Sequence, residues 1–371
     1  MHQEQRHPTH ALLREKGIDQ AIFGRRESIT WLTGFAPPVQ TGSNPFAAGN
    51  PILWYDRGEF TLIVVNQLET LATSFGDEPD GQVISYAGYT LDSPIVSSQN
   101  LLDAFHTIAT IHTGRIGVER SFVSDLITGP LERSTIVDID GWLEPLRMIK
   151  TEEELAVLRR NFALTDIGHA AAREAVAVGK REIDVWNAMH EAIQAAAGCR
   201  VPVGNDCIVG RRQANIGGWP EDYELHPGES LIVDISVVLD GYWSDSCATY
   251  YAGERSALQA KLHQTVRDSL DFVCSLLRPG AVCGEIDHAV REFIAEKSGY
   301  PVYPHHTGHG LGTSGHERPR IVPNSTDVLG EGMVVAVEPG IYLLGETSVR
   351  LEDVFLVQAD GVEKLTNHDI S

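Results

Sequence analysis

The part of the chain that follows Lys150 repeats one pattern, and this repetition limits the possible folds more than any other feature. Twice, two amphipathic helices with apolar residues three to four positions apart are followed by two strand-like runs. The helices lie in 151–198 and 256–299, and the strand-like runs lie in 231–250 and 333–357. The pattern predicts two similar halves, each of which packs a helix pair on a strand pair.

The residues before this repeat mix short strands with helices, which predicts a separate α/β domain. A chain of 371 residues, 42% of them hydrophobic, is long enough for two domains, each with its own core. We expect a first domain at 1–145 and a second at 146–371. A proline- and glycine-rich stretch, 36–45, predicts a long loop in the first domain. A helix expected at 11–16 precedes strands expected at 21–23, 60–65, 115–118 and 135–138.

The chain is acidic, because 29 lysines and arginines against 51 aspartates and glutamates give a net charge of −22. This charge argues against binding to nucleic-acid phosphates or to an anionic membrane surface. The first ten residues contain no apolar stretch that could serve as a signal peptide, and no apolar run is long enough to span a membrane. The five scattered cysteines suggest no disulfide framework. We therefore expect a soluble cytoplasmic protein with no nucleic-acid or membrane partner.

Two aspartates are embedded in the first strand pair, at 231–250. Asp240-Gly241 between two β-rich runs predicts a two-residue hairpin turn. In that register Asp234 lies opposite Cys247, and Asp234 and Asp245 share one face of the hairpin. Two carboxylates in an apolar strand pair repel each other unless a cation keeps both ionised. The alternative, that one of them points to solvent, stays open on this hairpin alone.

Two glutamates occupy the second strand pair in a similar way. A loop centred near Gly345 places Glu338 opposite Glu352 on one face. Pro339 argues against a continuous central strand, so we expect a bulge or a strand end there. Taken alone, both glutamates are more typical of half-exposed strand residues than of metal ligands.

Four of the fifteen histidines fall within the glycine-rich stretch 305–316. Glycines permit unusual backbone angles, and histidines so concentrated are typical of a metal or acid–base site. A polar surface loop is the alternative. A dinucleotide-binding loop is excluded, because no strand-turn-helix pattern surrounds these glycines.

Together, two Asp, one His and two Glu form an oxygen-rich ligand set that suits two hard or borderline divalent ions. Bridging carboxylates hold two such ions about 3.5–4 Å apart, with a metal-bound hydroxide as nucleophile at neutral pH. Histidines that do not bind metal are then available to stabilise an oxyanion or to transfer protons.

The order and spacing of these residues resemble the pita-bread metallopeptidase family, which includes methionine aminopeptidase, aminopeptidase P, prolidase and the non-peptidase creatinase. The similarity covers nearly the whole chain. Gly17–Asp19 and Trp31–Phe35 resemble the creatinase-type N-terminal domain, which methionine aminopeptidases usually lack, and Arg147–Thr151 resembles the entry to the catalytic domain. The resemblance implies an α/β N-terminal domain, a pseudo-two-fold pita-bread catalytic domain and a homodimer.

The resemblance also assigns roles to single residues, through the Gly-His-Gly-Leu-Gly, Val-Glu-Pro-Gly and Val-Arg-Leu-Glu-Asp motifs. It implies five ligands for two divalent metal ions, with manganese expected first and cobalt or zinc as alternatives: Asp234, Asp245, His309, Glu338 and Glu352. His305 and His316 match histidines that bind substrate and handle protons. Glu338 matches the general base or proton shuttle, and Arg350 matches an arginine near the metal site of prolidases, where it is expected to bind substrate.

Two positions depart from the family pattern. Ile216 and Gly217 stand where peptidase members carry a substrate-binding histidine, and Ala248 stands where an arginine is frequent. Both departures leave the metal ligands unchanged and are expected to alter the substrate pocket. Arg211 and Arg212 are a candidate replacement anchor for a substrate carboxylate.

The leading hypothesis is therefore a dinuclear metallohydrolase of the prolidase or aminopeptidase P branch that cleaves Xaa-Pro bonds in dipeptides or short peptides. The first alternative is a non-peptidase hydrolase of C–N bonds that, like creatinase, acts on a small amidino or modified amino-acid substrate. The second is an inactive binding module, which the presence of all five ligand residues disfavours.

Overall fold

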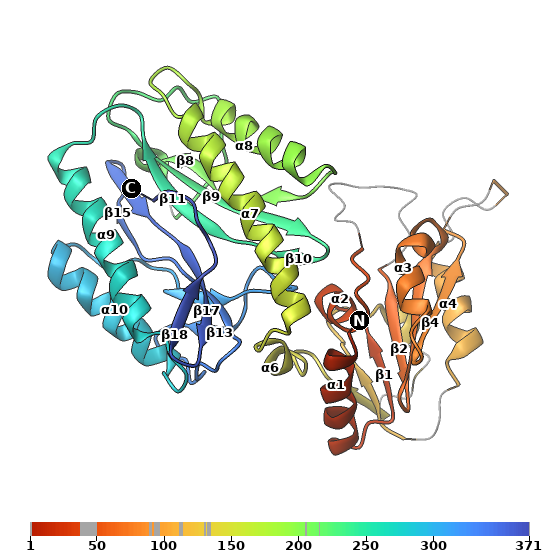
Figure 1. Cartoon of the computed structure of the whole chain (residues 1–371). Coiled ribbons are helices and arrows are strands. Elements are labelled where there is room, and N and C mark those ends of the chain that lie inside the picture. The colour runs from red at the N-terminus through yellow and green to blue at the C-terminus, as the bar shows by residue number, and fades with distance from the viewer. Residues whose placement is uncertain are drawn as a thin grey trace. The chain divides into compact units, whose positions relative to one another are not determined.

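The computed structural model describes residues 2–37, 50–88, 91–92, 97–110, 114–129, 131, 135–204, 206–214 and 216–370. The chain divides into two compact units, Met1–Arg147 and Met148–Ser371 (Figure 1). The domain boundary expected between residues 145 and 146 falls within helix α6 (Glu144–Arg147). Most of the loop expected at 36–45 lies outside the described residues.

The N-terminal unit is built on a six-stranded mixed sheet with the strand order β4-β3-β2-β1-β5-β6. Two separate apolar clusters line this sheet, and helices supply part of each. The strands are β1 (Gln20–Phe23), β2 (Ile52–Asp56), β3 (Glu59–Val65), β4 (Gly81–Tyr86), β5 (Ile116–Val118) and β6 (Ile136–Asp138). Besides α6, the helices are α1 (Gln3–Glu15), α2 (Arg26–Thr33), α3 (Glu69–Gly76), α4 (Ser97–Ile108) and α5 (Asp125–Thr128), with a 3₁₀ turn η1 at Asn66–Leu68.

Differences from the sequence expectations in this unit have local causes. Helix α1 begins at Gln3, well before the expected start at residue 11, because its first turns are polar and carry no apolar stripe. Strand β2 was not expected, although it is buried on both faces and pairs with β1 and β3. The periodicity of so short an apolar run does not distinguish a buried strand from a buried helix segment.

The C-terminal unit shows the expected repeat, in which two helices precede each sheet (Figure 1). The four helices are α7 (Glu152–Ala175), α8 (Glu182–Ala197), α9 (Ala257–Leu276) and α10 (Cys283–Ser298). Capping boxes begin α7 at Thr151 and α9 at Ser256, where side chains satisfy main-chain N–H groups that lack helical partners. Gly198 and Gly299 end α8 and α10 with positive φ angles of 66° and 74°.

Each half of this unit carries one five-stranded sheet, and a small hairpin joins the second half. The first sheet contains β7 (Val203–Gly204), β8 (Cys207–Val209), β9 (Ser230–Leu239), β10 (Tyr242–Trp243) and β11 (Ser246–Tyr251). A 3₁₀ turn, η3 (Gly210–Arg212), follows β8. The second sheet contains β12 (Gly308–Gly310), β13 (Glu317–Ile321), β14 (Val334–Val337), β17 (Asp353–Gln358) and β18 (Gly361–Lys364), and the hairpin consists of β15 (Gly340–Leu343) and β16 (Thr347–Arg350).

Helices α7 and α8 bury one apolar cluster against the first sheet, and α9 and α10 bury another against the second. Among the described residues, no helix is both long and apolar enough to cross a membrane. All five cysteines are free thiols.

Candidate metal centre

The hairpin of β9 and β11 carries the two aspartates. Asp240 and Gly241 form the turn with positive φ angles of 52° and 79°, which asparagine, aspartate and glycine tolerate best. Asp234 pairs with Cys247 across the hairpin, in the register that the turn predicts. Asp234 and Asp245 are both buried, and the charge of Asp234 is close enough to raise the pKa of the Asp245 carboxyl.

The two glutamates lie opposite each other where two strand pairs are interrupted. The pairs Val337–Asp353 and Gly340–Arg350 flank them on either side, so Glu338 faces Glu352. Strand β14 ends one residue before Glu338, as expected from the following proline. The main-chain N–H of Glu352 donates to the carbonyl of Cys247 at 2.8 Å, which joins this pair to the aspartate hairpin.

His309 lies in the middle of β12, between β13 and β14. A Cβ atom on the preceding residue, Gly308, would lie 2.2 Å from the carbonyl oxygen of Ala336, so only glycine lets β12 approach β14 this closely. The Nδ1 atom of His309 lies 3.0 Å from the carbonyl oxygen of Gly310. A hydrogen bond donated by Nδ1 leaves the lone pair of Nε2 facing the site, which is the usual state of a metal-binding histidine.

Arg350 is buried, and its guanidinium group donates hydrogen bonds to two carboxylates. One terminal nitrogen donates to Oδ2 of Asp206 at 2.5 Å and to Oδ2 of Asp234 at 2.7 Å. The other lies 3.4 Å from the hydroxyl of Tyr342. Arg350, which we expected near the metal site as a substrate-binding residue, is thus placed to orient Asp234.

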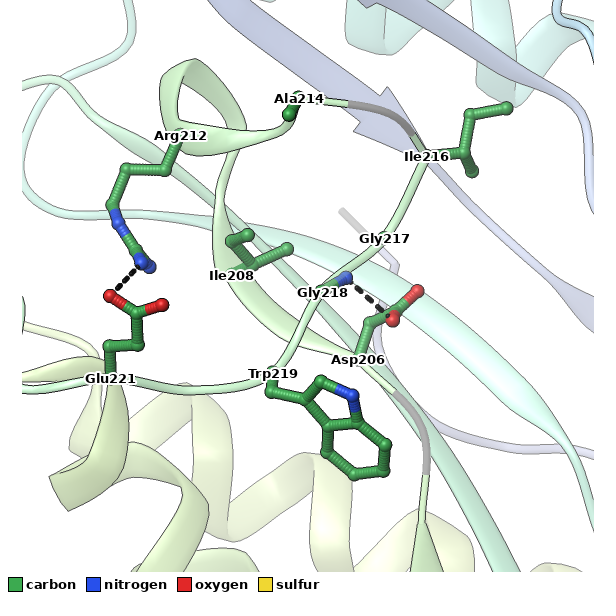
Figure 2. Close-up of a pocket in the computed structure, with 9 residues that line it drawn as sticks. All are labelled: Asp206, Ile208, Arg212, Ala214, Ile216, Gly217, Gly218, Trp219 and Glu221. Carbon is green, nitrogen blue, oxygen red and sulfur yellow. Dashed lines mark hydrogen bonds and ion pairs between the residues drawn. The ribbon is translucent and has the colours of Figure 1, made fainter.

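Ile216 and Gly217, the two residues that depart from the family pattern, line a cavity of about 580 Å³ (Figure 2). Asp206 receives a hydrogen bond from the main-chain N–H of Gly218 at the wall of this cavity, and the largely exposed Trp219 lies at its side. Ile216 also lines a smaller, more apolar cavity of about 210 Å³, together with Pro301, Val302, Tyr303, Pro304, Tyr342 and Leu344.

Arg211 and Arg212, the candidate carboxylate anchors, are both engaged in ion pairs. Arg212 lines the larger cavity but pairs with Glu182 and, at 2.5 Å, with Glu221 (Figure 2). Arg211 lies 3.4 Å from Glu229. The guanidinium of Arg212 is thus shared between two carboxylates, whereas that of Arg211 remains about half exposed.

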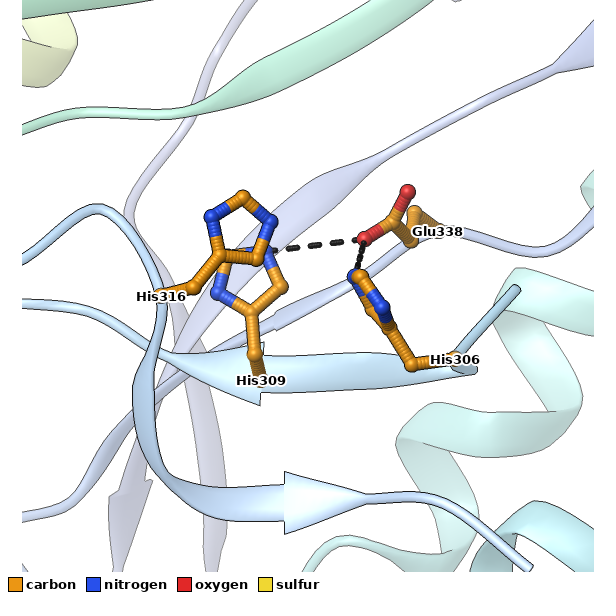
Figure 3. A group of neighbouring side chains, drawn as sticks. All are labelled: His306, His309, His316 and Glu338. Carbon is orange, nitrogen blue, oxygen red and sulfur yellow. Dashed lines mark ion pairs between the residues drawn. The ribbon is translucent and has the colours of Figure 1, made fainter. Parts of the chain in front are cut away.

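Among the residues that the structure describes, potential metal ligands form two overlapping groups. In each group, one ligand atom per residue lies within 4.8 Å of every other. One group combines Asp245, His309 and Glu352, and the other combines His306, His309, His316 and Glu338 (Figure 3). Nε2 of His309 lies 3.9 Å from Asp245, 3.5 Å from Glu338 and 3.9 Å from Glu352.

The buried carboxylates destabilise one another when they are charged. Burial raises the pKa of Asp245 well above its usual value, and the charges of Asp234 and Glu338 raise it further. Burial also raises the pKa of Glu352, with the charges of Asp245 and Glu338 as the next causes. A divalent cation bound between these carboxylates would offset the repulsion and allow them to stay ionised.

The histidines of the site have the opposite effect, because they lower the pKa of the neighbouring carboxyl group, that of Glu338. Burial by itself raises the pKa of Glu338, but the hydrogen bond and charge of His306 and the charges of His309 and His305 outweigh it and lower the pKa to about 2. Burial and the charge of His316 lower the pKa of His309 to about 3. The His309 ring is therefore neutral at pH 7, as a metal ligand must be.

Buried polar atoms without hydrogen-bond partners are a second indication that these residues can hold divalent metal ions. In the described part of the chain, the buried Nε2 of His309 and Oε1 of Glu352 have no hydrogen-bond partner. Buried polar atoms are rarely left in this state unless an ion or a water molecule completes them. Coordination of a cation by these two atoms would satisfy both.

The two histidines expected to bind substrate take different positions. His305 places Nδ1 2.7 Å from the carbonyl oxygen of His306 and Nε2 2.9 Å from the hydroxyl of Tyr342. Burial lowers the pKa of His305 to about 4. His316 is exposed and stacks on His309, with 3.9 Å between the ring centroids.

Three residues of the site were not singled out from the sequence: Asp206, His306 and Tyr342. The doubled histidine at 305–306 was the available signal for His306. Nothing local in the sequence marks Asp206 or Tyr342, because their partner Arg350 comes close only through folding.

Comparison with known proteins identifies the family. Residues 156–359 match metallopeptidase family M24, and residues 7–149 match the Creatinase/Prolidase N-terminal domain. An Xaa-Pro dipeptidase of Pyrococcus furiosus is 29% identical over 277 residues, which are 74% of this chain and 79% of that protein.

Solved structures show the same fold. The prolidase from Pyrococcus horikoshii OT3 superposes with a TM-score of 0.82 and 22% identity, over 99% of this chain and all of that one. The X-Pro aminopeptidase from Thermotoga maritima MSB8 gives 0.80 and 24%, over 99% and 98% of the two chains. The C-terminal unit thus has the pita-bread fold, and the chain belongs to metallopeptidase family M24.

Proposed function

We propose that this chain hydrolyses Xaa-Pro bonds in dipeptides or short peptides, in the manner of prolidase and aminopeptidase P. The observation that carries the proposal is the pair of ligand groups that share His309, set in a chain that belongs to a metallopeptidase family. The named relative of known activity is an Xaa-Pro dipeptidase, and it aligns with most of this chain.

The residues proposed to hold two divalent ions are Asp234, Asp245, His309, Glu338 and Glu352. Ions bound there would polarise a substrate carbonyl and lower the pKa of a water molecule, so that hydroxide is available near neutral pH. Arg350 holds Asp234 in place through the 2.7 Å hydrogen bond.

Protons are proposed to move through the histidine side of the site. Glu338 is buried with Oε1 2.6 Å from Nε2 of His306, so its carboxylate can accept a proton and return it to the leaving nitrogen. The neutral His305 accepts from the Tyr342 hydroxyl and orients it. The exposed ring of His316 is placed to contact the substrate carbonyl.

Further details belong to the same proposal. Manganese is proposed for the two ions, since four of the five proposed ligands are carboxylates and carboxylates suit manganese, with cobalt or zinc as alternatives. A homodimer is proposed from the family resemblance. A cytoplasmic location is proposed because none of the five cysteines is paired.

Hydrolysis of a panel of Xaa-Pro dipeptides and one Xaa-Pro-Yaa tripeptide tests the substrate. The protein is stripped of metal and reloaded with manganese, cobalt or zinc, and His309→Ala serves as the inactive control. Cleavage of dipeptides supports a prolidase, and cleavage of the tripeptide alone supports an aminopeptidase P. Arg212 and Arg350 are both paired with carboxylates of the protein, so neither is free to bind the C-terminal carboxylate of a dipeptide. We therefore expect the tripeptide to be cleaved at least as well as the dipeptides.

A protein that binds two metal ions but cleaves no Xaa-Pro peptide would refute the proposed substrate. That result would favour a C–N hydrolase of creatinase type. Ile216 and Ala248 are consistent with this alternative, because they replace residues that peptidase members of the family carry in the substrate pocket.

A further inference from the structure

A buried ion pair, which the proposed mechanism does not use, ends at the residue after His316. Nζ of Lys150 lies 2.9 Å from Oε1 of Glu317, and the side chains of the two residues are 0% and 2% exposed. Lysine and glutamate are rarely buried to this extent unless they are paired. Glu317 is the first residue of β13, so the pair is joined by one peptide bond to a histidine proposed to contact the substrate.

The lysine end of the pair projects from main chain that is itself held in place. The main-chain N–H of Lys150 donates to the carbonyl of Gly332 at 2.9 Å, and Ile149 forms a β-bridge with Met333. The ammonium group also donates to the carbonyl of Met148 at 3.3 Å. Lys150 is therefore a fixed point against which the carboxylate of Glu317 is held.

The loop before β13 packs on this pair and leads to His316. A Cβ atom on Gly312 would lie 2.7 Å from Oε1 of Glu317 and 3.3 Å from Cε of Lys150, so the main chain passes very close to both side chains. The N–H of Gly312 donates to the carbonyl of Ser314 at 3.0 Å. The hydroxyl of Ser314 donates in turn to the carbonyl of His316 at 3.1 Å. The ion pair thus supports the backbone from which His316 extends.

The ring of His316 needs such support, because it lies at the exposed side of the site. It stacks on the ring of His309, with 3.9 Å between the centroids and 26° between the planes (Figure 3). Its ring also meets that of His306 edge to face at 5.3 Å. A displacement of about 1 Å in a group that acts on the substrate can cost about 10²-fold in rate.

We propose that Lys150 and Glu317 are positioning residues, whose buried ion pair holds His316 over His309 in the orientation that meets the substrate carbonyl. The proposal rests on the role that the proposed function gives to His316. A buried ion pair contributes little net stability, because the loss of hydration offsets the attraction of the charges. Fixing one conformation of the loop is the use that the geometry gives to this pair.

Two variants remove the ion pair in different ways. Glu317→Gln removes one charge and keeps the shape of the side chain. The double variant Lys150→Met/Glu317→Gln removes both charges, so that no buried lysine is left without a counter-charge. At saturating manganese, kcat for an Xaa-Pro peptide should fall by about ten- to hundred-fold in the double variant, with a smaller change in KM.

A double-mutant cycle with His316→Ala separates positioning from a general effect on the fold. If the ion pair acts through His316, its removal should cost little further kcat once His316 is alanine. An equal loss of kcat in both backgrounds would overturn the proposal. Asp80→Asn is the matched control, because it removes the carboxylate that lies 2.8 Å from the buried Arg6 in the N-terminal unit. Its kcat should match that of the wild type.

Histidine NMR gives a second readout that requires no substrate. In zinc-loaded protein with ¹³C-labelled histidine, the ring resonance of His316 is the one that disappears in His316→Ala. In the double variant this resonance should move toward that of an exposed histidine such as His288, and in Asp80→Asn it should stay in place. A wild-type His316 resonance in the double variant would overturn the proposal. If no Xaa-Pro peptide is cleaved but the resonance moves, the proposed substrate fails and the inference about the ion pair stands.

Discussion

At the scale of single residues, His309 determines how the two ligand groups can be used. Its Nδ1 is engaged with a main-chain carbonyl, so only Nε2 faces the cluster. One nitrogen lone pair binds one ion, and the groups therefore cannot both be completed by this histidine. A second ion would therefore need carboxylates that can bind both ions. Glu338 and Glu352 face each other across the site and could act as such bridging carboxylates.

The buried carboxylates predict that metal ions stabilise the protein. A ligand at 100 times its dissociation constant adds about 2.7 kcal/mol per site, and a domain of this size gains about 2–4 °C per kcal/mol. We expect divalent manganese or cobalt to raise the melting temperature of the C-terminal unit by roughly 5–10 °C per ion. Calorimetry of the chelated and reloaded protein measures this shift.

Glu352→Gln provides the matched variant for that experiment. Without metal it removes one of several buried like charges, so it should melt at or above the metal-free wild type. With metal it should gain much less stability than the wild type. A full metal-induced shift in Glu352→Gln would show that this carboxylate is not a ligand.

At the scale of elements, the site depends on how closely β12 approaches β14. We expect Gly308→Ala to push β12 away, because its Cβ would meet the carbonyl oxygen of Ala336 at 2.2 Å. The resulting overlap should cost on the order of 1–3 kcal/mol and displace His309. Urea unfolding and cobalt affinity should therefore fall together.

Gly204→Ala in β7 is the control for this change. A Cβ at Gly204 meets no atom within 4 Å, so stability and cobalt affinity should stay near the wild-type values. Wild-type cobalt affinity in Gly308→Ala would contradict the importance of the close strand approach.

A buried glutamate makes the N-terminal unit sensitive to pH. Glu119 follows β5 and accepts hydrogen bonds from the main chain of Gly24 and Arg25 and from the hydroxyl of Ser28. Burial nevertheless raises the pKa of Glu119 to about 7, against the opposing effect of these bonds and of Arg147. The folded protein thus retains a proton that the unfolded chain releases above about pH 4.3.

Stability should therefore fall as pH rises from about 4.5 to 7 and then level off, with a total contribution on the order of 3 kcal/mol from this group. Glu119→Gln keeps an acceptor for the main chain and cannot ionise. The difference in unfolding free energy between the variant and the wild type should therefore grow in favour of the variant over this range. Urea titrations at several pH values measure it, and a constant difference would contradict the raised pKa.

The elements that the sequence predicted best are those with local signals. Thr151 and Ser256 begin helices through capping boxes, and Asp240-Gly241 sets a hairpin register. Strand β2 and the short strand β12 were missed, because neither has enough alternating residues to reveal its period. The contacts of His306 with Glu338 were also not predictable, since no local pattern connects the two.

At the scale of the whole molecule, the two halves of the C-terminal unit contribute complementary ligands. The first half supplies Asp234 and Asp245 from one hairpin, and the second supplies His309, Glu338 and Glu352. The bridge between Cys247 and Glu352 joins the two halves at the site itself. The group of Asp245, His309 and Glu352 draws on both halves, whereas the second half alone contains the group of His306, His309, His316 and Glu338.

The most direct test of the account is Xaa-Pro peptide hydrolysis while metal is titrated into the stripped protein, with bound metal measured in the same samples. We predict no activity without metal, activity that rises with bound ion until two equivalents are taken up, and a loss of at least about 10³-fold in His309→Ala, as expected for removal of a group that the chemistry needs. Undiminished hydrolysis by the metal-free protein, or by His309→Ala, would contradict the account.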